Sequence, residues 1–365
     1  MNIFAFALPM VAFAVAMFCG ADVEYWWAYL LIAAAAEGLI YLVFYLTTSS
    51  KEYLSGYVIS VTHHFAWTEL QEISETKYDE KGNSRTEKKV ELINHPDEYY
   101  WDLNTGKRDS IHSALFYQMC QQWGTGMEWI SVYHPNCVEG GDGEECHWDG
   151  DEYNTRTVTY THRYRNPVRN SNSIFRGQRV GRAEAKSLGL FEYPAISGWD
   201  QPVLLVSPDL AYTGDMDEAN FELQHLNAFC GLPNQIHVFI LLFPAAAGVG
   251  IALKQRDYWE GCNKNEFVVC LGMNDDRVEW CHTLSWEDEP VLDAKVKDYF
   301  LHHAQPQMDE FVHWLRDHLQ LWKRKEFEDF KYLGWHMSQK GSALYWAAAL
   351  ALSLMVMLFA FWISK

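Results

Sequence analysis

The stretch Ile236-His237-Val238-Phe239-Ile240-Leu241-Leu242-Phe243 decides the fold, because it is an apolar run of the length of a strand. A helix-like segment from 248 to 259 follows it, and a second short apolar run extends from 265 to 272. Apolar runs of this length, bounded by Pro, Gly and Asn, are typical of strands buried on both faces of a parallel sheet. The order strand, helix, strand therefore predicts a right-handed crossover between two parallel strands.

Apolar and polar residues alternate after a polar turn at 274–276. Val278, Trp280 and Leu284 fall on one face of an extended chain, and Glu279 falls on the other. This alternation predicts a half-covered strand that returns antiparallel to the second apolar run. Helices are expected at about 218–229, 291–304 and 307–331, the last with apolar residues at helical spacing. The predicted fold class of this part is α+β, with a mixed sheet and flanking helices.

The segment from 52 to 95 has β character. Tyr57-Val58-Ile59-Ser60-Val61 is rich in β-branched and aromatic residues, and Lys81-Gly82-Asn83 is typical of a turn. The stretch from 86 to 93 is charged and β-branched, which predicts a returning strand at the edge of a sheet.

Three long apolar stretches predict membrane helices: Ile3–Cys19, Trp26–Leu46 and Ala343–Ile363. A helix that crosses a bilayer needs roughly 20 apolar residues, which the second and third stretches supply. The first lacks the basic start of a secretory signal, so we interpret it as half of a helical hairpin; a cleaved leader is the alternative. We therefore expect a membrane hairpin at 1–48, a soluble domain at 49–340 and a C-terminal span at 341–365.

Lys and Arg residues near the spans predict the orientation of the chain. The turn between the first two spans has no basic residue, whereas Lys51 follows the second span and five basic residues precede the third: Lys323, Arg324, Lys325, Lys331 and Lys340. The predicted location is a bacterial inner membrane or an equivalent membrane, with the large domain in the cytoplasm.

The formal net charge of −19 restricts the partners of the soluble domain. An acidic surface is repelled by nucleic acid phosphates, and the sequence has neither a Gly-rich phosphate loop nor a dinucleotide-binding motif. No nucleic acid partner is expected. The expected partners are the membrane lipid bilayer and either another protein or further copies of this chain.

His134, Cys137, Cys146 and His147 are candidate zinc ligands. Two thiols and two imidazoles at the ends of one loop could supply four tetrahedral ligands, and cytoplasmic cysteines remain reduced. The alternative is a strand, loop, strand unit whose ends hold two facing cysteines, bridged or free. Zinc is thus the predicted cofactor.

A basic segment in this acidic chain contains Arg163, Arg165, Arg169 and Arg176. Guanidinium groups bind carboxylates and phosphates, so these residues are candidates for an anion site or for contact with an acidic partner. The alternative is a surface whose charge is neutralised by neighbouring Asp and Glu residues.

Glu37 lies in the middle of the second predicted span. A carboxyl group in lipid is costly and is a functional hypothesis by default. Ala33 to Ala36 and Gly38 form a small-residue face beside it, which permits close helix packing. Three roles stay open: a packing contact within the chain, an oligomer contact, and ion conduction.

Two E-x-x-H pairs, Glu222 with His225 and Glu310 with His313, lie on predicted helices. Di-iron proteins use two such pairs, but they add two further Glu residues from a helical bundle. Helices packed on a sheet do not offer that bundle, so we favour exposed helix faces.

The run from Tyr258 to Cys270 is similar to a run in uncharacterised membrane-anchored proteins of bacteria and tailed phages, which usually have Gly in place of Cys262. The segment from His162 to Phe175 is similar to the same group. The order of elements from about 218 to 321 resembles TPM domains, which are often tethered by terminal membrane helices. The first resemblance implies architecture alone, and the TPM pattern implies metal binding and weak phosphatase activity.

Together these features predict a membrane-tethered binding or assembly module. The alternatives are a metal-dependent, phosphatase-like hydrolase and an ion-conducting membrane oligomer gated by the soluble domain.

Overall fold

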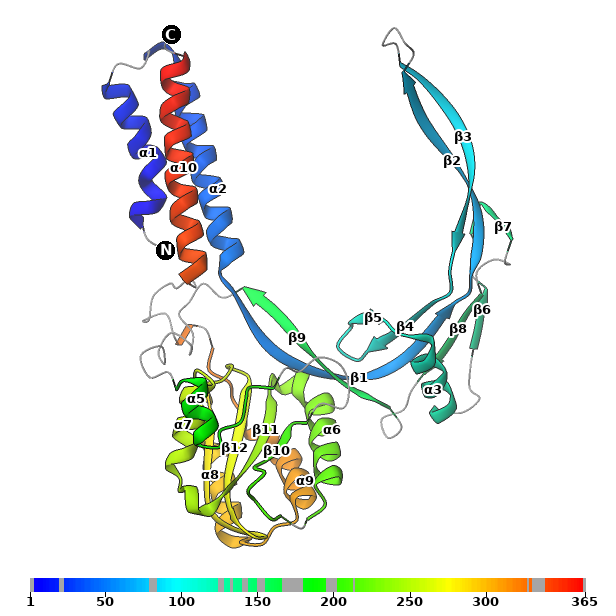
Figure 1. Ribbon diagram of the computed structural model, residues 1–365, viewed down its shortest axis with the longest axis vertical. Helices are drawn as coiled ribbons and strands as arrows, with labels where there is room; N and C mark the ends of the chain where they lie inside the picture. The colour runs from blue at the N-terminus through cyan, green and yellow to red at the C-terminus, as the bar shows by residue number, and fades with distance from the viewer. Residues whose placement is uncertain are drawn as a thin grey trace.

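The two apolar runs form the centre of a four-stranded sheet in the computed structural model of the protein (Figure 1). The structure describes residues 3–19, 23–78, 84–123, 128–131, 134–139, 144–149, 155–165, 180–194, 202–212, 214–326, 328–329 and 339–363. Strands β11 (His237–Pro244) and β12 (Glu266–Asn274) pair in parallel, and β10 (Leu204–Val206) pairs in parallel with β11. Strand β13 (Arg277–Ser285) returns antiparallel to β12, so the order is β10-β11-β12-β13. The predicted α+β fold with a mixed sheet is confirmed.

Helices flank this sheet (Figure 1). They are α5 (Arg182–Ser187), α6 (Met216–Asn234), α7 (Gly250–Tyr258), α8 (Val291–His302) and α9 (Met308–His318). Asp215 caps α6 by accepting hydrogen bonds from the N–H groups of Asp217 and Glu218. The buried Asn227 of α6 donates to the carbonyl of Val238 (2.9 Å) and accepts from its N–H (2.7 Å). Its side chain therefore fixes α6 onto β11.

The core of this α/β unit is built on β11 and β12. Phe239, Phe243 and Phe267 are fully buried and belong to the same core as Phe311 of α9. Burial of a side chain of this size stabilises the fold by about 1.5–3 kcal/mol. The strands are buried on both faces, as the continuous apolar runs predict.

Helix α9 is shorter than the sequence predicts. The apolar periodicity indicates a helix from 307 to 331, but α9 ends at His318 and a 3-10 turn, Leu319–Leu321, follows. The chain is extended at Trp322, and Arg324 forms an isolated β-bridge with the segment after β13. The prediction of one continuous helix was wrong, because the later apolar residues reach the core from a turn and an extended segment.

A second, six-stranded sheet forms an arm that leaves the α/β unit (Figure 1). Its longest strand, β1 (Ser49–His64), pairs antiparallel with β9 over its first half and with β4 and β8 over its second half. The remaining elements are β4 (Glu98–Leu103), β5 (Arg108–Ser110), α3 (Ser113–Trp123), β6 (Glu128–Ser131), β8 (Glu144–Asp149) and β9 (Thr157–Arg165). Phe116 and Met119 of α3 pack against Val58 and Val61 of β1 in a second core.

The arm ends in a long hairpin of two twelve-residue strands, β2 (Trp67–Tyr78) and β3 (Ser84–His95). A short strand, β7 (Cys137–Glu139), pairs with β2 near its base, so the order is β3-β2-β7. Strand β3 contains the stretch that the sequence predicts as a charged edge strand, and that prediction is confirmed. Figure 1 shows the hairpin extending away from the α/β unit.

The terminal apolar stretches form three helices that lie side by side (Figure 1). Helices α2 (Trp26–Thr47), preceded by a 3-10 turn at Val23–Tyr25, and α10 (Gln339–Ile363) contain segments long and apolar enough to cross a membrane. Helix α1 (Ile3–Phe18) has 16 residues, or about 24 Å at ~1.5 Å per residue, which is less than a bilayer core of about 30 Å. Within the described part of the chain, the candidate spans therefore number two rather than the three predicted.

Small residues line the contacts between these helices. Ala12 of α1 packs with Ala33 and Ala36 of α2 and with Val356 of α10. The predicted small-residue face of α2 is split: Ala33 and Ala36 are buried, whereas Gly38 is exposed.

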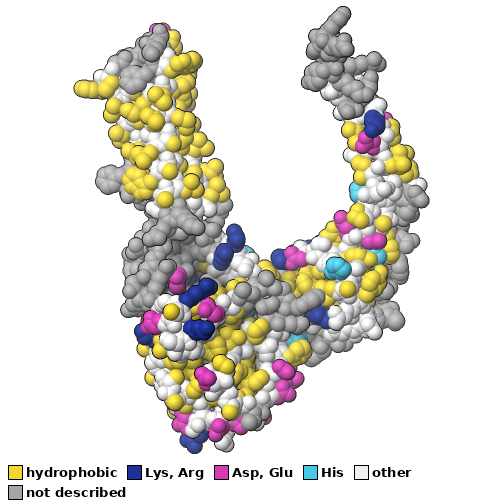
Figure 2. Space-filling model, in the orientation of Figure 1, with side chains coloured by type: hydrophobic (Ala, Val, Ile, Leu, Met, Phe, Trp, Pro, Cys, Tyr) yellow, Lys and Arg dark blue, Asp and Glu magenta, His cyan; other side chains and the backbone are white. Residues whose placement is uncertain are grey.

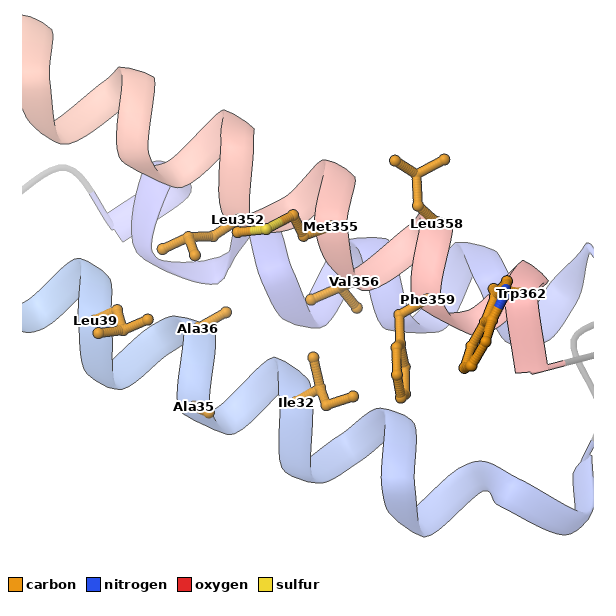
Figure 3. Close-up of a pocket in the computed structure, with 10 residues that line it drawn as sticks. All are labelled: Ile32, Ala35, Ala36, Leu39, Leu352, Met355, Val356, Leu358, Phe359 and Trp362. Carbon is orange, nitrogen blue, oxygen red and sulfur yellow. The ribbon is translucent and has the colours of Figure 1, made fainter. Parts of the chain in front are cut away.

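The outer surface of the bundle is apolar (Figure 2). Leu31 of α2 and Leu358 of α10 are about 60% exposed (63% and 60%). A groove of about 730 Å³ lies between α2 and α10, and Figure 3 shows Val356 and Phe359 pointing toward Ile32 across it. Side chains of this kind favour contact with lipid or with another helix over contact with water.

Candidate functional site

The hairpin β2–β3 carries an exposed apolar stripe on one face. Leu70 of β2 lies directly opposite Leu92 of β3, and Val90 is two residues from Leu92 on the same face. Leu70 is 42% exposed, Leu92 is 64% exposed and Val90 is 56% exposed. Apolar side chains that gather on one face of a projecting hairpin form a surface suited to contact with another protein.

The outer edge of β3 has no neighbouring strand among the described residues, because the sheet order is β3-β2-β7. Such an edge presents N–H and C=O groups that can pair with another strand. Charged residues follow this edge: Lys88 pairs with Glu72 (3.0 Å) and Lys89 with Glu91 (2.6 Å). These exposed charges keep the edge soluble and restrict which strands can join it.

The base of the hairpin is held by three stacked rings. The indole of Trp67 lies between the imidazoles of His95 and His134, with centroid separations of 4.1 and 3.8 Å and interplanar angles of 11° and 8°. His95 Nε2 also lies 3.3 Å from Glu69 Oε1. The stack links both strands of the hairpin to the segment that precedes β7, which fixes the direction in which the hairpin leaves the arm.

The predicted zinc ligands are distributed over two sheets. His134 stacks on Trp67, and Cys137 is in β7, where it pairs with β2. The backbones of Cys146 and His147 are in β8, paired with β1 in the other sheet, and their side chains lie outside the described part of the structure. Among the side chains that are described, no group of three or more His, Cys, Asp and Glu could hold a metal ion. The zinc site stays a prediction, which elemental analysis of the purified protein would test.

A buried ion pair positions the arm on the α/β unit. Glu52 of β1 accepts a hydrogen bond from Arg324 Nη1 (3.2 Å) and lies 3.0 Å from His162 Nδ1 of β9. The side chains of Glu52 and Arg324 are only 8% and 16% exposed, so their attraction is screened less than that of a surface pair. Glu52 follows α2 and Arg324 precedes α10. The pair therefore clamps together the two segments that lead to the candidate spans.

A second buried carboxyl group, Glu266 at the start of β12, is bound by neutral donors. Its oxygens accept hydrogen bonds from Tyr193 Oη, from Asn263 N (2.8 Å) and from Asn263 Nδ2 (2.7 Å). Burial raises the pKa of Glu266, and these hydrogen bonds oppose that rise. Tyr53 of the arm stacks on Tyr193, with centroids 5.7 Å apart, so the network also contacts β1.

Burial also lowers the pKa of two basic groups at this junction. The pKa of Lys264 falls to about 7, because its side chain is buried and because Arg324 adds a nearby positive charge. The pKa of His237 falls to about 3 through burial alone. His237 Nδ1 lies 3.3 Å from Ser55 Oγ, and Ser55 is 2.8 Å from Thr159 Oγ1. His237 is therefore neutral at physiological pH and contacts the arm through Ser55.

This buried junction lies at the amino ends of the parallel strands. His237 is the first residue of β11 and Glu266 the first of β12. Ligands of open α/β sheets bind outside the carboxyl ends of the strands instead. The arrangement supports a role for the junction in holding the arm on the α/β unit.

The structure brings one of the four predicted anion-site arginines into a defined setting. Arg163 is exposed on β9, directly opposite Lys51 of β1. The backbone of Arg165 pairs with Ser49, but its side chain lies outside the described part of the structure. Arg169 and Arg176 lie outside the described residues. An anion site that includes all four arginines stays a prediction.

Glu37 lies on α2 with intermediate burial, next to the buried Ala36 and the exposed Gly38. Within the described residues it forms no hydrogen bond or ion pair. The choice between a packing contact, an oligomer contact and ion conduction stays open at this residue.

The two E-x-x-H helices are neighbours, but their side chains form ion pairs. Glu222 of α6 lies 3.2 Å from Arg316 Nη2 and 3.8 Å from His313 Nδ1 of α9. His225 turns away and its Nδ1 lies 3.0 Å from the carbonyl oxygen of Phe221. Glu310 and His313 are exposed, as predicted, whereas the prediction of exposed faces was wrong for His225, which is buried, and for Glu222, which is half-buried at the contact with α9.

Sequence reasoning missed the residues of the buried junction. Lys264 and Glu266 carry a readable signal, because charges beside an apolar run that is buried on both faces need polar partners. Glu52 carries none, because Arg324 is 272 residues away in the chain.

Comparisons of this chain with models of protein families, with curated protein sequences and with solved structures find no match. The likeness to membrane-anchored phage and bacterial proteins and to TPM domains stays a prediction.

Proposed function

We propose that this chain is a membrane-tethered assembly module that joins copies of itself through the hairpin β2–β3. The observation that carries the proposal is the free edge of β3 beside the exposed stripe of Leu70, Val90 and Leu92. Helices α2 and α10 hold the module in the bilayer. Helix α1 packs with both and acts as a third, shorter member of the membrane bundle.

The orientation that we propose places the arm and the α/β unit in the cytoplasm of a bacterium or in an equivalent compartment. The support is the excess of Lys and Arg on that side of the candidate spans. The exposed leucines of α2 and α10 face lipid in this arrangement, which removes their contact with water.

The β3 edge is complementary to itself. When two copies pair antiparallel about Val90, Lys89 of each lies opposite Glu91 of the other. The same register places Val90 of one copy opposite Val90 of the other, and the aliphatic part of Lys88 opposite Leu92. Opposite charges across strands and a shared apolar face each contribute about 0.2–1 kcal/mol per pair.

A cysteine at the centre of this register tests the proposal. In the full chain in detergent, we expect Val90→Cys to form a disulfide-linked dimer on mild oxidation, since the two side chains would lie opposite each other. Val138→Cys is the matched control, because Val138 is also a valine and is similarly exposed (52% against 56%). Non-reducing gel electrophoresis, with the wild-type chain for comparison, measures the yield.

A charge exchange tests the register independently. Lys89→Glu and Glu91→Lys should each weaken the dimer, because each places like charges opposite, and the double variant should restore it. Light scattering of the detergent-solubilised chain gives the masses. Equal crosslinking at Val90 and Val138, or a chain that stays monomeric at all concentrations, contradicts the proposal.

A further inference from the structure

Two exposed cations lie opposite each other directly below the candidate membrane helix α2. Helix α2 ends at Thr47, β1 begins at Ser49, and Lys51 of β1 pairs in register with Arg163 of β9. Both side chains are exposed. Residues opposite each other in an antiparallel pair have Cβ atoms about 4.5–5.5 Å apart, and like charges in such positions repel.

Neither cation has a carboxylate partner within the described residues. The next residue pair of β1 and β9 does contain an acidic and a basic partner, because Glu52 and His162 lie 3.0 Å apart. Two exposed cations elsewhere in the chain do have carboxylate partners: Lys88 contacts Glu72 and Arg277 contacts Glu279. In a chain with a net charge of −19, two facing cations that have no carboxylate partner among the described residues favour an anionic ligand from outside the chain.

We propose that Lys51 and Arg163 bind the phosphate of an anionic phospholipid headgroup. The inference rests on the proposed placement of α2 in the bilayer. A guanidinium group binds phosphate oxygens in a bidentate manner, and an ammonium group adds a second positive charge beside it.

Position favours lipid over a soluble anion. Lys51 is four residues beyond the end of α2, which is at most about 13 Å along a strand that rises ~3.3 Å per residue. Strand β1 curves away from the direction of α2 (Figure 1). Lys51 therefore lies less deep below the bilayer than its distance along the strand. A Debye length of about 8 Å at physiological ionic strength screens repulsion between the headgroup and any more distant acidic groups of the chain.

Lipid retention by the full chain tests the site. The purified chain is equilibrated in mild detergent with equimolar phosphatidylglycerol and phosphatidylcholine of the same acyl chains, and native mass spectrometry gives the ratio retained. Each cation near an anionic surface is expected to contribute about fivefold, so Lys51→Gln with Arg163→Gln should lower the phosphatidylglycerol preference about 25-fold. The control, Lys254→Gln with Arg277→Gln, removes the same charge from exposed ion pairs of the α/β unit and should leave the preference unchanged.

Three results overturn the headgroup site: an unchanged preference in the Lys51/Arg163 variant, an equal loss in the control variant, or full displacement of lipid by millimolar inorganic phosphate. Vesicle flotation separates this failure from failure of the membrane proposal. A chain that floats without a phosphatidylglycerol preference refutes the headgroup site alone. A chain that does not float refutes the membrane placement and the headgroup site together.

Discussion

Glu52, His237 and Lys264 are buried at the same junction, and the protein accommodates their charges in different ways. Glu52 lies between two basic partners, Arg324 and His162. His237 contacts the hydroxyl of Ser55, and burial favours its neutral form and lowers its pKa to about 3. Lys264 lies near Arg324, and burial together with that positive charge lowers its pKa to about 7. Burial thus lowers the pKa of both His237 and Lys264, and at Lys264 the positive charge of Arg324 adds to the effect while Asp329 opposes it.

His237 should make the stability of the protein depend on pH in the acidic range. The unfolded chain protonates His237 near its ordinary pKa of 6.5, whereas the native chain keeps it neutral down to about pH 3. Between these values the unfolded state binds more protons, so stability falls as the pH drops. From pH 7 to pH 5 we expect the wild type to lose about 2 kcal/mol more stability than His237→Leu. Denaturant unfolding of the detergent-solubilised chain at both pH values measures this, and equal losses would show that the histidine titrates normally.

At the scale of single elements, local patterns predict the strands well and the contacts poorly. The apolar runs at 236–243 and 265–272 indicate β11 and β12, because strands buried on both faces are apolar throughout except for the polar residues at their starts, His237, Asn265 and Glu266. The charged edge strand at 86–93 is equally readable. The buried junction cannot be predicted in this way, because Glu52 and Arg324 are 272 residues apart and come into contact only in the folded chain. Helix α9 ends early because helical spacing alone does not distinguish a helix from a turn and an extended segment that reach one core.

Glu37 tests what holds the membrane bundle together. The structure places it beside Ala36, which packs against α1 and α10. Glu37→Gln keeps a hydrogen-bonding group and should leave the assembly largely intact. Glu37→Leu removes that group and should weaken helix association by about 1 kcal/mol. Thermal unfolding and oligomer mass of the detergent-solubilised variants measure the effect, and a Glu37→Leu protein identical to the wild type would remove the packing role.

At the scale of the whole molecule, the hairpin and the helical bundle extend to the same side of the α/β unit (Figure 1). A flat bilayer around α2 and α10 would meet the hairpin, whose strands carry Glu72, Lys88 and Lys89 on exposed surfaces. Charged side chains in the bilayer core are costly, so the hairpin is excluded from it. The arm must therefore turn away from the bundle when the chain enters a membrane. The suitable place is β1 between Val58 and Ser60, where its register shifts and it leaves β9 for β4 and β8.

Spin labels can measure this turn. In a background without native cysteines, labels at Thr86→Cys in β3 and Leu354→Cys in α10 report the distance between hairpin and bundle. We expect a longer distance in lipid nanodiscs than in detergent, because only the bilayer excludes the charged hairpin. A second pair, on α6 and α9 at Phe221→Cys and His313→Cys, should not change. An unchanged Thr86–Leu354 distance would mean that the arm is rigid, and that the bundle is not surrounded by a flat bilayer.

Strand β1 directly follows α2 in the chain, so it is synthesised long before its partner strand β9. Residues Ser49 to Tyr57 follow the candidate membrane helix α2 and are made early in synthesis, but their partners in β9 run from Thr157 to Arg165. At about 5–20 residues per second, the ribosome needs roughly 5–20 s to supply them. During that time the first half of β1 has no β9 strand to pair with. Two nascent chains on neighbouring ribosomes could then exchange their β9 strands, so the rate of synthesis, and not only the native contacts, would decide how many arms close on their own chain.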